Sequence, residues 1–291
     1  MHEHVASESV PLASSPIPSS DADRLSVSIV VYHPEPAVIA RTLSSLAVAC
    51  AAWRAQRGGA VDVCLVVNGG TIDLTESIAE LEAAGVACTV MSGHGNVGYG
   101  RGHNLAIEPA RSRYHLVLNP DVDLEADSLV RGIAFLDAHP DAGLLAPRTS
   151  DGKGRLQYLC RRYPAVLDLF VRGFLPASLR RPFAGRLARY EMRDCINATD
   201  VTWQPPIVSG CFMLFRTEVL KRLGGFDPRY FLYFEDYDLS VRASRVARIV
   251  YVPAVRIAHH GGGASRKGFA HIRMFAASAF RFYRRFGWKW L

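Results

Sequence analysis

The chain has 291 residues, and its 34 Lys and Arg against 27 Asp and Glu give a formal net charge of +7. Because 49% of the residues are hydrophobic, we expect a sizeable core in one large or two small α/β domains, and a wholly disordered chain is excluded. No uninterrupted apolar run approaches the roughly 20 residues of a membrane-spanning helix, and the N-terminus lacks the layout of a signal peptide, so the sequence predicts a cytoplasmic protein.

Residues 1–24 are rich in Ser, Pro and Ala and predict a disordered N-terminal tail. The six cysteines are scattered without a Cys-x-x-Cys pair, and several lie in apolar stretches, so we expect buried thiols.

Strand-like and helix-like patterns alternate through the first half of the chain. Apolar runs predict strands, and 3.6-residue spacing predicts helices, at Leu25–Tyr32, Ala37–Arg54, Val61–Val67, Leu74–Ala84, Val86–Val90, a strand that includes Leu116–Leu118, and a helix after Glu125. This alternation is typical of a mostly parallel sheet with helices on both faces. Ligands of such sheets bind beyond the carboxyl ends of the strands, where the motifs YHPEP, NGG and NPDVD fall.

Two acids follow the fourth strand, in NPDVD. Residues i and i+2 of an extended segment point the same way, so Asp121 and Asp123 can face one divalent cation. Mg²⁺ or Mn²⁺ suits such a pair, because it takes one or two protein carboxylates and completes its shell with water and phosphate oxygens. The alternative is an ordinary surface turn, since Asn, Pro and Asp are common turn residues.

A glycine-rich segment, GHGNVGYGRGHN, precedes another helix. It does not follow the first strand, as a dinucleotide fingerprint would, and we interpret it as a loop that wraps a nucleotide and sugar, with Arg101 offsetting phosphate charge at a helix N-terminus. Residues 147–204 are Arg-rich and broken by proline, which predicts a variable insertion or lid. Ile207–Phe215 and Arg248–Val252 then predict two further strands.

A cluster of acids and aromatic residues lies in GGFDPRYFLYFEDYDLSVR. Acids in a first helical turn favour the helix dipole, and Asp238 has the spacing of a surface ion pair with Arg242. The aromatic residues before Glu235 and Asp236 would restrict water around these carboxylates. A partly desolvated carboxylate has a raised proton affinity, so Asp236 is the candidate general base.

Two histidines end an apolar stretch in VRIAHHGGGAS. Adjacent residues of a strand face opposite ways, so we expect at most one of His259 and His260 to be a ligand. A neutral imidazole could bind the metal beside Asp123 or a phosphate.

The C-terminal residues 266–291 contain seven basic residues and no acid. A helical wheel places Phe269, Ile272, Ala276, Phe280 and Tyr283 on one face, bordered by arginines. This basic amphipathic helix either lies on an anionic membrane, with Trp288 and Trp290 at the interface, or docks on the domain. The patch is too local to predict nucleic-acid binding.

Together the motifs SIVVYHPEP, VVNGG, GNVGYGRGHN, LNPDVD, VSGCFMLFR, GGFDPRYFLYFEDYDLSVR and HHGGGAS resemble those of family 2 glycosyltransferases of the GT-A fold, across residues 25–265. The wording of NPDVD and FLYFEDYDLSVR is most similar to bacterial rhamnosyltransferases that build O-antigen and other cell-surface polysaccharides from dTDP-L-rhamnose. The resemblance implies an inverting transferase that uses a nucleotide-diphosphate sugar, a divalent cation and a saccharide acceptor, which could be linked to polyprenyl diphosphate.

The resemblance also implies roles for individual residues. It assigns Asp236 as the base, Glu235 to the acceptor side, and Asp121, Asp123 and one of the histidines, with His260 at the commoner spacing, to the metal. Asp121 also meets the donor diphosphate. The other donor-binding positions are Val31, Tyr32, Glu35, Asn68, Gly98 and Arg101.

Two other functions remain open from the residues alone. A sugar-nucleotide pyrophosphorylase also has an α/β sheet and acidic metal ligands, but it would carry a glycine-rich loop where this chain has YHPEP. A non-catalytic basic protein that binds membrane or nucleic acid would leave the acids in NPDVD and FEDYD unexplained.

Overall fold

The computed structural model describes residues 24–70, 72–261 and 268–291. The predicted tail, apart from Arg24, and the GGAS end of the HHGGGAS motif therefore lie outside the described residues. Of the six cysteines, which are all free, Cys50, Cys160 and Cys211 are buried.

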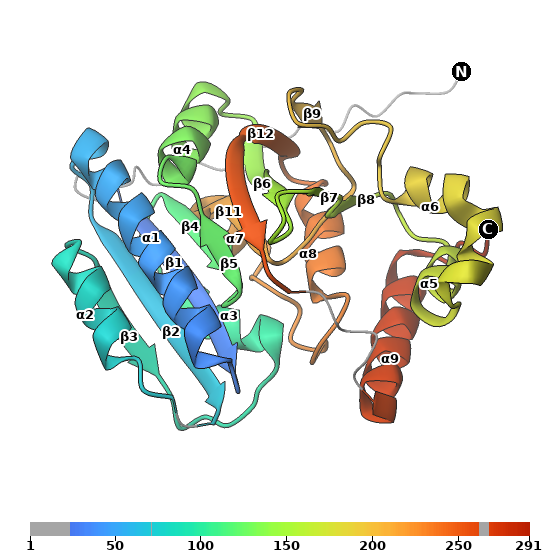
Figure 1. Ribbon diagram of the computed structural model, residues 1–291, viewed down its shortest axis with the longest axis horizontal. Helices are drawn as coiled ribbons and strands as arrows, with labels where there is room; N and C mark the ends of the chain where they lie inside the picture. The colour runs from blue at the N-terminus through green and yellow to red at the C-terminus, as the bar shows by residue number, and fades with distance from the viewer. Residues whose placement is uncertain (1–23, 71, 262–267) are drawn as a thin grey trace, which may run out of the picture.

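A ten-stranded mixed sheet forms the centre of the described structure (Figure 1). Its main path is β3-β2-β1-β4-β11-β6-β12-β5, and four of its seven pairings are parallel: β3 with β2, β2 with β1, β1 with β4, and β6 with β12. The strands of this path are β1 (Leu25–Tyr32), β2 (Val61–Gly69), β3 (Ala87–Met91), β4 (Tyr114–Leu118), β5 (Val122–Leu124), β6 (Ala142–Ser150), β11 (Phe212–Arg216) and β12 (Arg248–His259). Short strands β7 (Leu156–Gln157) and β9 (Thr202–Trp203) pair with β6 and β12, while β8 (Cys160–Arg161) and β10 (Ile207–Val208) form a separate pair.

Helices cover both faces of the sheet, which confirms the predicted α/β architecture (Figure 1). One face packs against α1 (Pro36–Arg57), α2 (Thr75–Ala83) and α4 (Ser128–Ala138), and the other against α3 (Tyr99–Ile107), α7 (Thr217–Arg222) and α8 (Glu235–Ala243). A third group lies at the end of the molecule remote from β3: α5 (Val166–Phe174), η1 (Ala177–Phe183), α6 (Ala184–Tyr190) and α9 (Gly268–Phe286).

Among the described helices, α1 alone is long and apolar enough to cross a membrane by length and composition. The sequence analysis did not single it out, because Arg41, Ser44 and Ser45 interrupt its apolar pattern. Its side chains Leu43, Leu46 and Trp53 are buried in the main core, so α1 packs here as the core helix of an α/β sheet.

Two of the strand predictions require correction. Residues 207–215 do not form one strand, because β10 pairs with β8 and the chain then turns at Gly210 before β11 enters the central sheet. The strand from Arg248 continues past Val252 to His259, with a register shift between Val252 and Arg256. The sequence analysis missed β6, a central strand that extends to Ser150, inside the predicted insertion.

Polar side chains are buried within the parallel half of the sheet. Ser26 and Ser28 lie 2.7 and 2.9 Å from the two ring nitrogens of His115, and Ser28 is also 2.7 Å from His103. Burial lowers the pKa of both histidines, that of His115 to about 3, so both are neutral. This network satisfies polar groups that would otherwise weaken the core.

Candidate active site

The first two predicted donor segments meet at the carboxyl edge of the sheet. Tyr32 at the end of β1 is paired with Gly69 of β2, as parallel pairing requires. Val31 is fully buried in the core, whereas Tyr32 is 55% exposed and Glu35 is exposed at the start of α1. The structure therefore brings Tyr32 and Glu35 to the accessible edge, and Val31 shapes this edge only from inside the core.

Asn68 ties the edge of the sheet to the glycine-rich loop. Its side-chain amide donates to the Gly98 carbonyl at 2.9 Å, and its oxygen lies 3.0 Å from His94. Gly98 has φ +90°, and a Cβ there would lie 2.3 Å from the Phe231 carbonyl oxygen, so only glycine fits. Arg101 is exposed and donates to the Pro228 carbonyl at 2.5 Å.

The acidic pair after β4 lies beside both histidines. His260 Nε2 is 2.7 Å from Asp123 Oδ2, and His259 Nε2 is 3.5 Å from Asp121 Oδ1. Both histidines lie beside an acid, because β12 ends at His259 and His260 no longer follows the alternation of a strand. That at most one of them is a ligand stays a prediction. The amide of His260 donates to the Asp121 carbonyl at 2.9 Å, which holds the two segments together.

Oxygen atoms of this pair are left free for a cation. Among the described residues, Asp121 Oδ1 and Asp123 Oδ1 are buried and accept no hydrogen bond, and the nearest basic side-chain atom to Asp121 Oδ1 is His259 Nε2 at 3.5 Å. Burial alone would raise the pKa of Asp121, but contacts from His259 and Asn119 outweigh it and lower the pKa, which favours the carboxylate. Arg41 also approaches Asp123, at 3.4 Å.

No set of three or more acidic, histidine or cysteine side chains in the described ranges is arranged as a complete metal site. The two acids with one neighbouring histidine still fit Mg²⁺ or Mn²⁺, because these ions draw most of their ligands from water and phosphate. Asp121, Asp123 and a neighbouring histidine are the residues that would hold the ion.

The second acidic pair opens α8. Asp236 is partly exposed, and its two oxygens accept hydrogen bonds from the amides of Gly210 at 3.0 Å and Tyr237 at 2.9 Å. Glu235 is buried, and its Oε2 has no partner among the described residues. Burial, followed by the charge of Asp236, raises the pKa of Glu235, and burial also raises the pKa of Asp236. Because only Asp236 has amide donors, we infer that Asp236 carries the negative charge while Glu235 keeps a proton.

A turn with a strained backbone precedes Glu235 and Asp236 and orients them. Tyr233 and Phe234 both have left-handed backbones, with φ of 70° and 64°, a conformation that costs roughly 1–2 kcal/mol per residue. The helix α9 holds the turn: Ser278 donates to the Leu232 carbonyl at 2.9 Å, and the Tyr233 hydroxyl lies 2.9 Å from His271 Nδ1. Phe234 is buried against Phe275 and Phe282 of the same helix.

The ion pair predicted within α8 is not on the surface. Asp238 is fully buried and receives Arg242 at 2.5 Å and Arg285 of α9 at 2.7 Å. A buried carboxylate needs such partners, so Asp238 serves to hold α8 against α9.

Tyr99, which the sequence analysis missed, links the two acidic clusters. Its hydroxyl lies 2.7 Å from the Gly210 carbonyl and 2.9 Å from Asn119 Oδ1, and its amide donates to Phe231. Burial, and then the neighbouring acids of α8, raise the pKa of Tyr99 well above the usual value, so the hydroxyl keeps its proton. The signal was the one aromatic residue between the glycines of GNVGYGRG.

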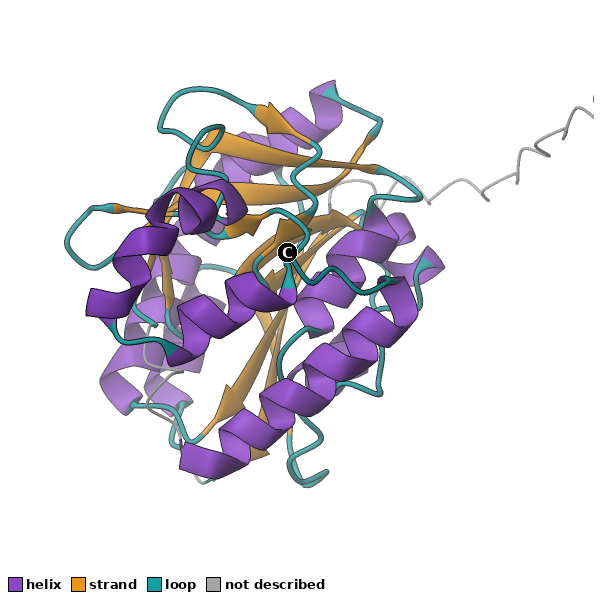
Figure 2. Ribbon diagram, turned by 90° about the vertical axis from the view of Figure 1, so that its right-hand side faces the viewer, coloured by secondary structure: helices purple, strands orange, loops and turns teal. Residues whose placement is uncertain are grey.

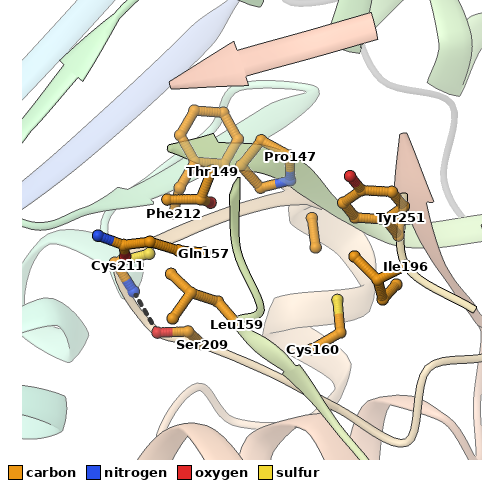
Figure 3. A pocket seen from close by; sticks show the side chains of 11 residues that line it. Pro147, Thr149, Gln157, Leu159, Cys160, Ile196, Ser209, Cys211, Phe212 and Tyr251 are labelled. Carbon is orange, nitrogen blue, oxygen red and sulfur yellow. Dashed lines mark hydrogen bonds between the residues drawn. The ribbon is translucent and has the colours of Figure 1, made fainter. Parts of the chain in front are cut away.

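A small cavity lies behind the same segment (Figure 3). Its wall includes Leu159 and Cys160 on one side and Ser209, Cys211 and Phe212 on the other, with the Cys211 amide donating to Ser209 Oγ at 3.4 Å. The space open to a water-sized sphere is about 10 Å³, which is roughly room for one water molecule. No sugar or nucleotide fits there, so the segment that supports Asp236 is closely packed from behind.

Tyr99→Phe tests the link between the clusters. The ring keeps its contacts with His103 and Phe226, but the Gly210 carbonyl and Asn119 Oδ1 lose the single hydroxyl that lies within hydrogen-bond distance of both, so we expect the free energy of unfolding to fall by about 1–2 kcal/mol. Urea denaturation measures it. Tyr32→Phe, at an exposed position, is the matched control, and an equal loss in both variants would refute the link.

Glu235→Gln tests the proton on Glu235. Above about pH 4, where an unfolded glutamic acid ionises, the folded wild-type protein still holds this proton, so its stability falls as pH rises toward the raised pKa. Glutamine cannot ionise, so the variant should gain stability relative to wild type with increasing pH. Chemical denaturation across pH measures the difference, with Glu218→Gln controlling for the substitution. Parallel pH curves would contradict the inference.

Three comparisons place the chain among known proteins. The model of the family "Glycosyltransferase like family 2" matches residues 22–285. The chain is 31% identical over 288 residues to N-acetylglucosaminyl-diphospho-decaprenol L-rhamnosyltransferase of Mycobacterium tuberculosis, covering 91% of this chain and 86% of that protein. It is 29% identical over 201 residues to the rhamnosyltransferase WbbL of Escherichia coli K12, covering 66% and 72%.

Solved structures share the fold. Mannosyltransferase PcManGT of Pyrobaculum calidifontis, in complex with GDP-Man and Mn²⁺, superposes with a TM-score of 0.58 at 18% identity, over 94% of this chain and 68% of that one. The 1–349 fragment of S. aureus TarS superposes with a TM-score of 0.53 at 19% identity, over 88% of this chain and 65% of the fragment. The family match over nearly all the described residues confirms the resemblance drawn from the motifs: the chain belongs to the family 2 glycosyltransferases of the GT-A fold.

Proposed function

We propose that this protein is an inverting, metal-dependent rhamnosyltransferase that moves L-rhamnose from dTDP-L-rhamnose to a lipid-linked saccharide. The observation that carries the proposal is the arrangement of two acidic clusters, one with free oxygens and one with a separately held carboxylate, joined by Tyr99. Family membership sets aside the pyrophosphorylase and the non-catalytic binding protein.

The donor lies along the carboxyl edge of the sheet in this proposal. The nucleoside contacts Tyr32 and Glu35, which are exposed there, while Asn68 and Gly98 position the loop around it. Asp121, Asp123 and His260 would hold Mg²⁺ or Mn²⁺. When bound, the cation offsets the negative charge that develops on the leaving diphosphate.

The chain's own residues handle the proton. Asp236, ionised and partly exposed, accepts the proton of the acceptor hydroxyl as that oxygen attacks the anomeric carbon. The bond from this carbon to the diphosphate breaks on the opposite face, so a single displacement inverts the configuration. Glu235, which keeps its proton, can donate a hydrogen bond on the acceptor side without competing as a base.

The name of one relative supports the proposed acceptor. The M. tuberculosis protein is named for transferring L-rhamnose to N-acetylglucosaminyl-diphospho-decaprenol, and it aligns with 91% of this chain. We therefore propose a polyprenyl-diphosphate-linked acceptor and a role in O-antigen or another cell-surface polysaccharide. The protein would work in the cytoplasm, peripherally on the inner membrane.

Asp236→Asn tests the base. The amide keeps the shape of the side chain but cannot take a proton, so we expect kcat to fall by about two or more orders of magnitude with donor binding retained. Release of dTDP measures kcat, and calorimetry measures donor binding. Asp141→Asn, in an exposed ion pair, is the matched control. Normal turnover by Asp236→Asn would assign the proton transfer to another group.

A calorimetric panel tests donor and metal together. We expect dTDP-L-rhamnose to bind more tightly than UDP-N-acetylglucosamine or GDP-mannose, and Mg²⁺ to strengthen its binding by at least about tenfold because the cation would offset the charge of the diphosphate. Asp123→Asn should remove this Mg²⁺ effect, whereas Asp127→Asn, on a nearby exposed ion pair, should keep it. Tight binding that ignores Mg²⁺ would contradict metal dependence.

A further inference from the structure

One side of the molecule carries most of its exposed large apolar side chains. Nine of the fourteen in the described residues lie in α5, η1, α9 and the C-terminal residues 287–291. They are Phe170, Phe174, Leu179, Phe269, Ile272, Phe280, Trp288, Trp290 and Leu291. We call this surface, formed by α5, η1, α9 and residues 287–291, the aromatic-basic face; Figure 2 shows α5 and α9 from this side.

The helix α9 has two apolar stripes. Phe275, Phe282, Tyr283 and Phe286 pack on the domain. Phe269, Ile272, Ala276 and Phe280, spaced at three or four residues, remain exposed. Of the face predicted from the helical wheel, only Tyr283 is buried, so α9 docks on the domain and still presents an apolar stripe outward.

Contacts between segments distant in sequence join α5 to this stripe. The amides of Val166 and Leu167 donate to the Lys289 and Trp290 carbonyls, at 2.8 and 3.2 Å. The Trp288 ring stacks on Trp290 at 5.0 Å and meets Phe280 edge-on at 5.9 Å. The start of α5 therefore lies beside the C-terminal segment, and the rings of that segment continue the exposed stripe of α9.

The charge of this face is one-sided. Residues 166–190 hold five arginines and one acid, Asp168, which is buried and paired with Arg186. Residues 268–291 hold five basic residues and no acid. Five exposed cations on α6, η1, α9 and the C-terminal segment have no acidic partner in the described part of the chain: Arg181, Arg189, Arg273, Arg284 and Lys289.

We propose that the aromatic-basic face is a docking surface for a lipid bilayer that carries anionic headgroups. Aromatic side chains flanked by unpaired arginines match the two parts of such an interface, the apolar boundary and the negative surface potential. The C-terminal helix and the α5–η1 arm form this surface together. The inference deepens the proposed function, because a lipid-linked acceptor is presented at a membrane.

The position of this face relative to the candidate base supports the inference. Through Ser278, His271 and Arg285, α9 contacts the strained turn and α8, which carries Asp236. Docking on α9 would thus hold the bilayer against the helix that supports the turn before Asp236.

Vesicle co-sedimentation without donor or acceptor tests the apolar part. We expect the protein to bind vesicles of phosphatidylcholine mixed with phosphatidylglycerol, and Phe170→Ser/Phe280→Ser/Trp290→Ser to weaken this binding by at least about tenfold. The control replaces three exposed valines elsewhere: Val48→Ser/Val90→Ser/Val201→Ser. Circular dichroism and thermal melting establish that both triple variants remain folded. Equal binding by the two triple variants would overturn the proposal.

A charge variant tests the headgroup requirement. Arg181→Gln/Arg284→Gln should weaken binding to the anionic vesicles by about 25-fold, at about fivefold per charge, while Arg111→Gln/Arg222→Gln should not. Equally tight binding to phosphatidylcholine alone would overturn the anionic part. A concentration-dependent dimer that the aromatic triple variant abolishes, without vesicle binding, would assign the face to a second copy of the chain.

Turnover with a short-chain, water-soluble acceptor separates this inference from the proposed function. The surface variants should keep that activity, whereas Asp236→Asn should lose it. If the protein bound vesicles but transferred no sugar from any nucleotide sugar, the proposed function would be refuted, whereas the proposed docking surface would still be supported.

Discussion

The antiparallel pairing of β4 with β11 is the constraint on which the candidate active site depends. It sets Leu118 opposite Phe212, so the turn that carries Asp121 and Asp123 begins beside the segment that receives Asp236. The Asn119 amide donates to the Cys211 carbonyl, and Tyr99 spans Asn119 and Gly210. A shift of this register by one residue would turn the buried side chains of β11 to the other face and separate the two clusters.

Unequal hydrogen bonding gives two adjacent carboxyl groups different protonation states. Glu235 is buried and Asp236 only partly exposed, but only Asp236 accepts backbone amides on both of its oxygens. Two neighbouring acids in a low-dielectric setting do not ionise together easily, so the one with donors takes the charge. The strained backbone at Tyr233 and Phe234 sets this geometry, and packing by α9 offsets its cost. The C-terminal helix is thereby part of the support of the site as well as an exposed surface.

Much of the fold follows from local patterns. The bounds predicted for β1 match the structure, and those for β2 and α1 differ by a few residues, because continuous apolar runs and helical spacing report burial directly. The sequence analysis missed β6 because Pro147 and Arg148 interrupt the apolar pattern in the second half of this strand. Residues 207–215 read as one strand because both halves are apolar, and nothing local reveals that they pair with different partners.

Composition and motif order were enough to identify the α/β class, the acids after β4, the acids that open α8, and the family. These features depend only on residue types and on their spacing over a few positions, and both can be read directly from the sequence. The three-dimensional structure alone decided that both histidines meet the acidic pair, that Tyr99 joins the clusters, and that α9 buries one apolar stripe while exposing another. Each of these depends on contacts between residues about twenty to more than a hundred positions apart, and pattern analysis over a short window carries no information about such contacts.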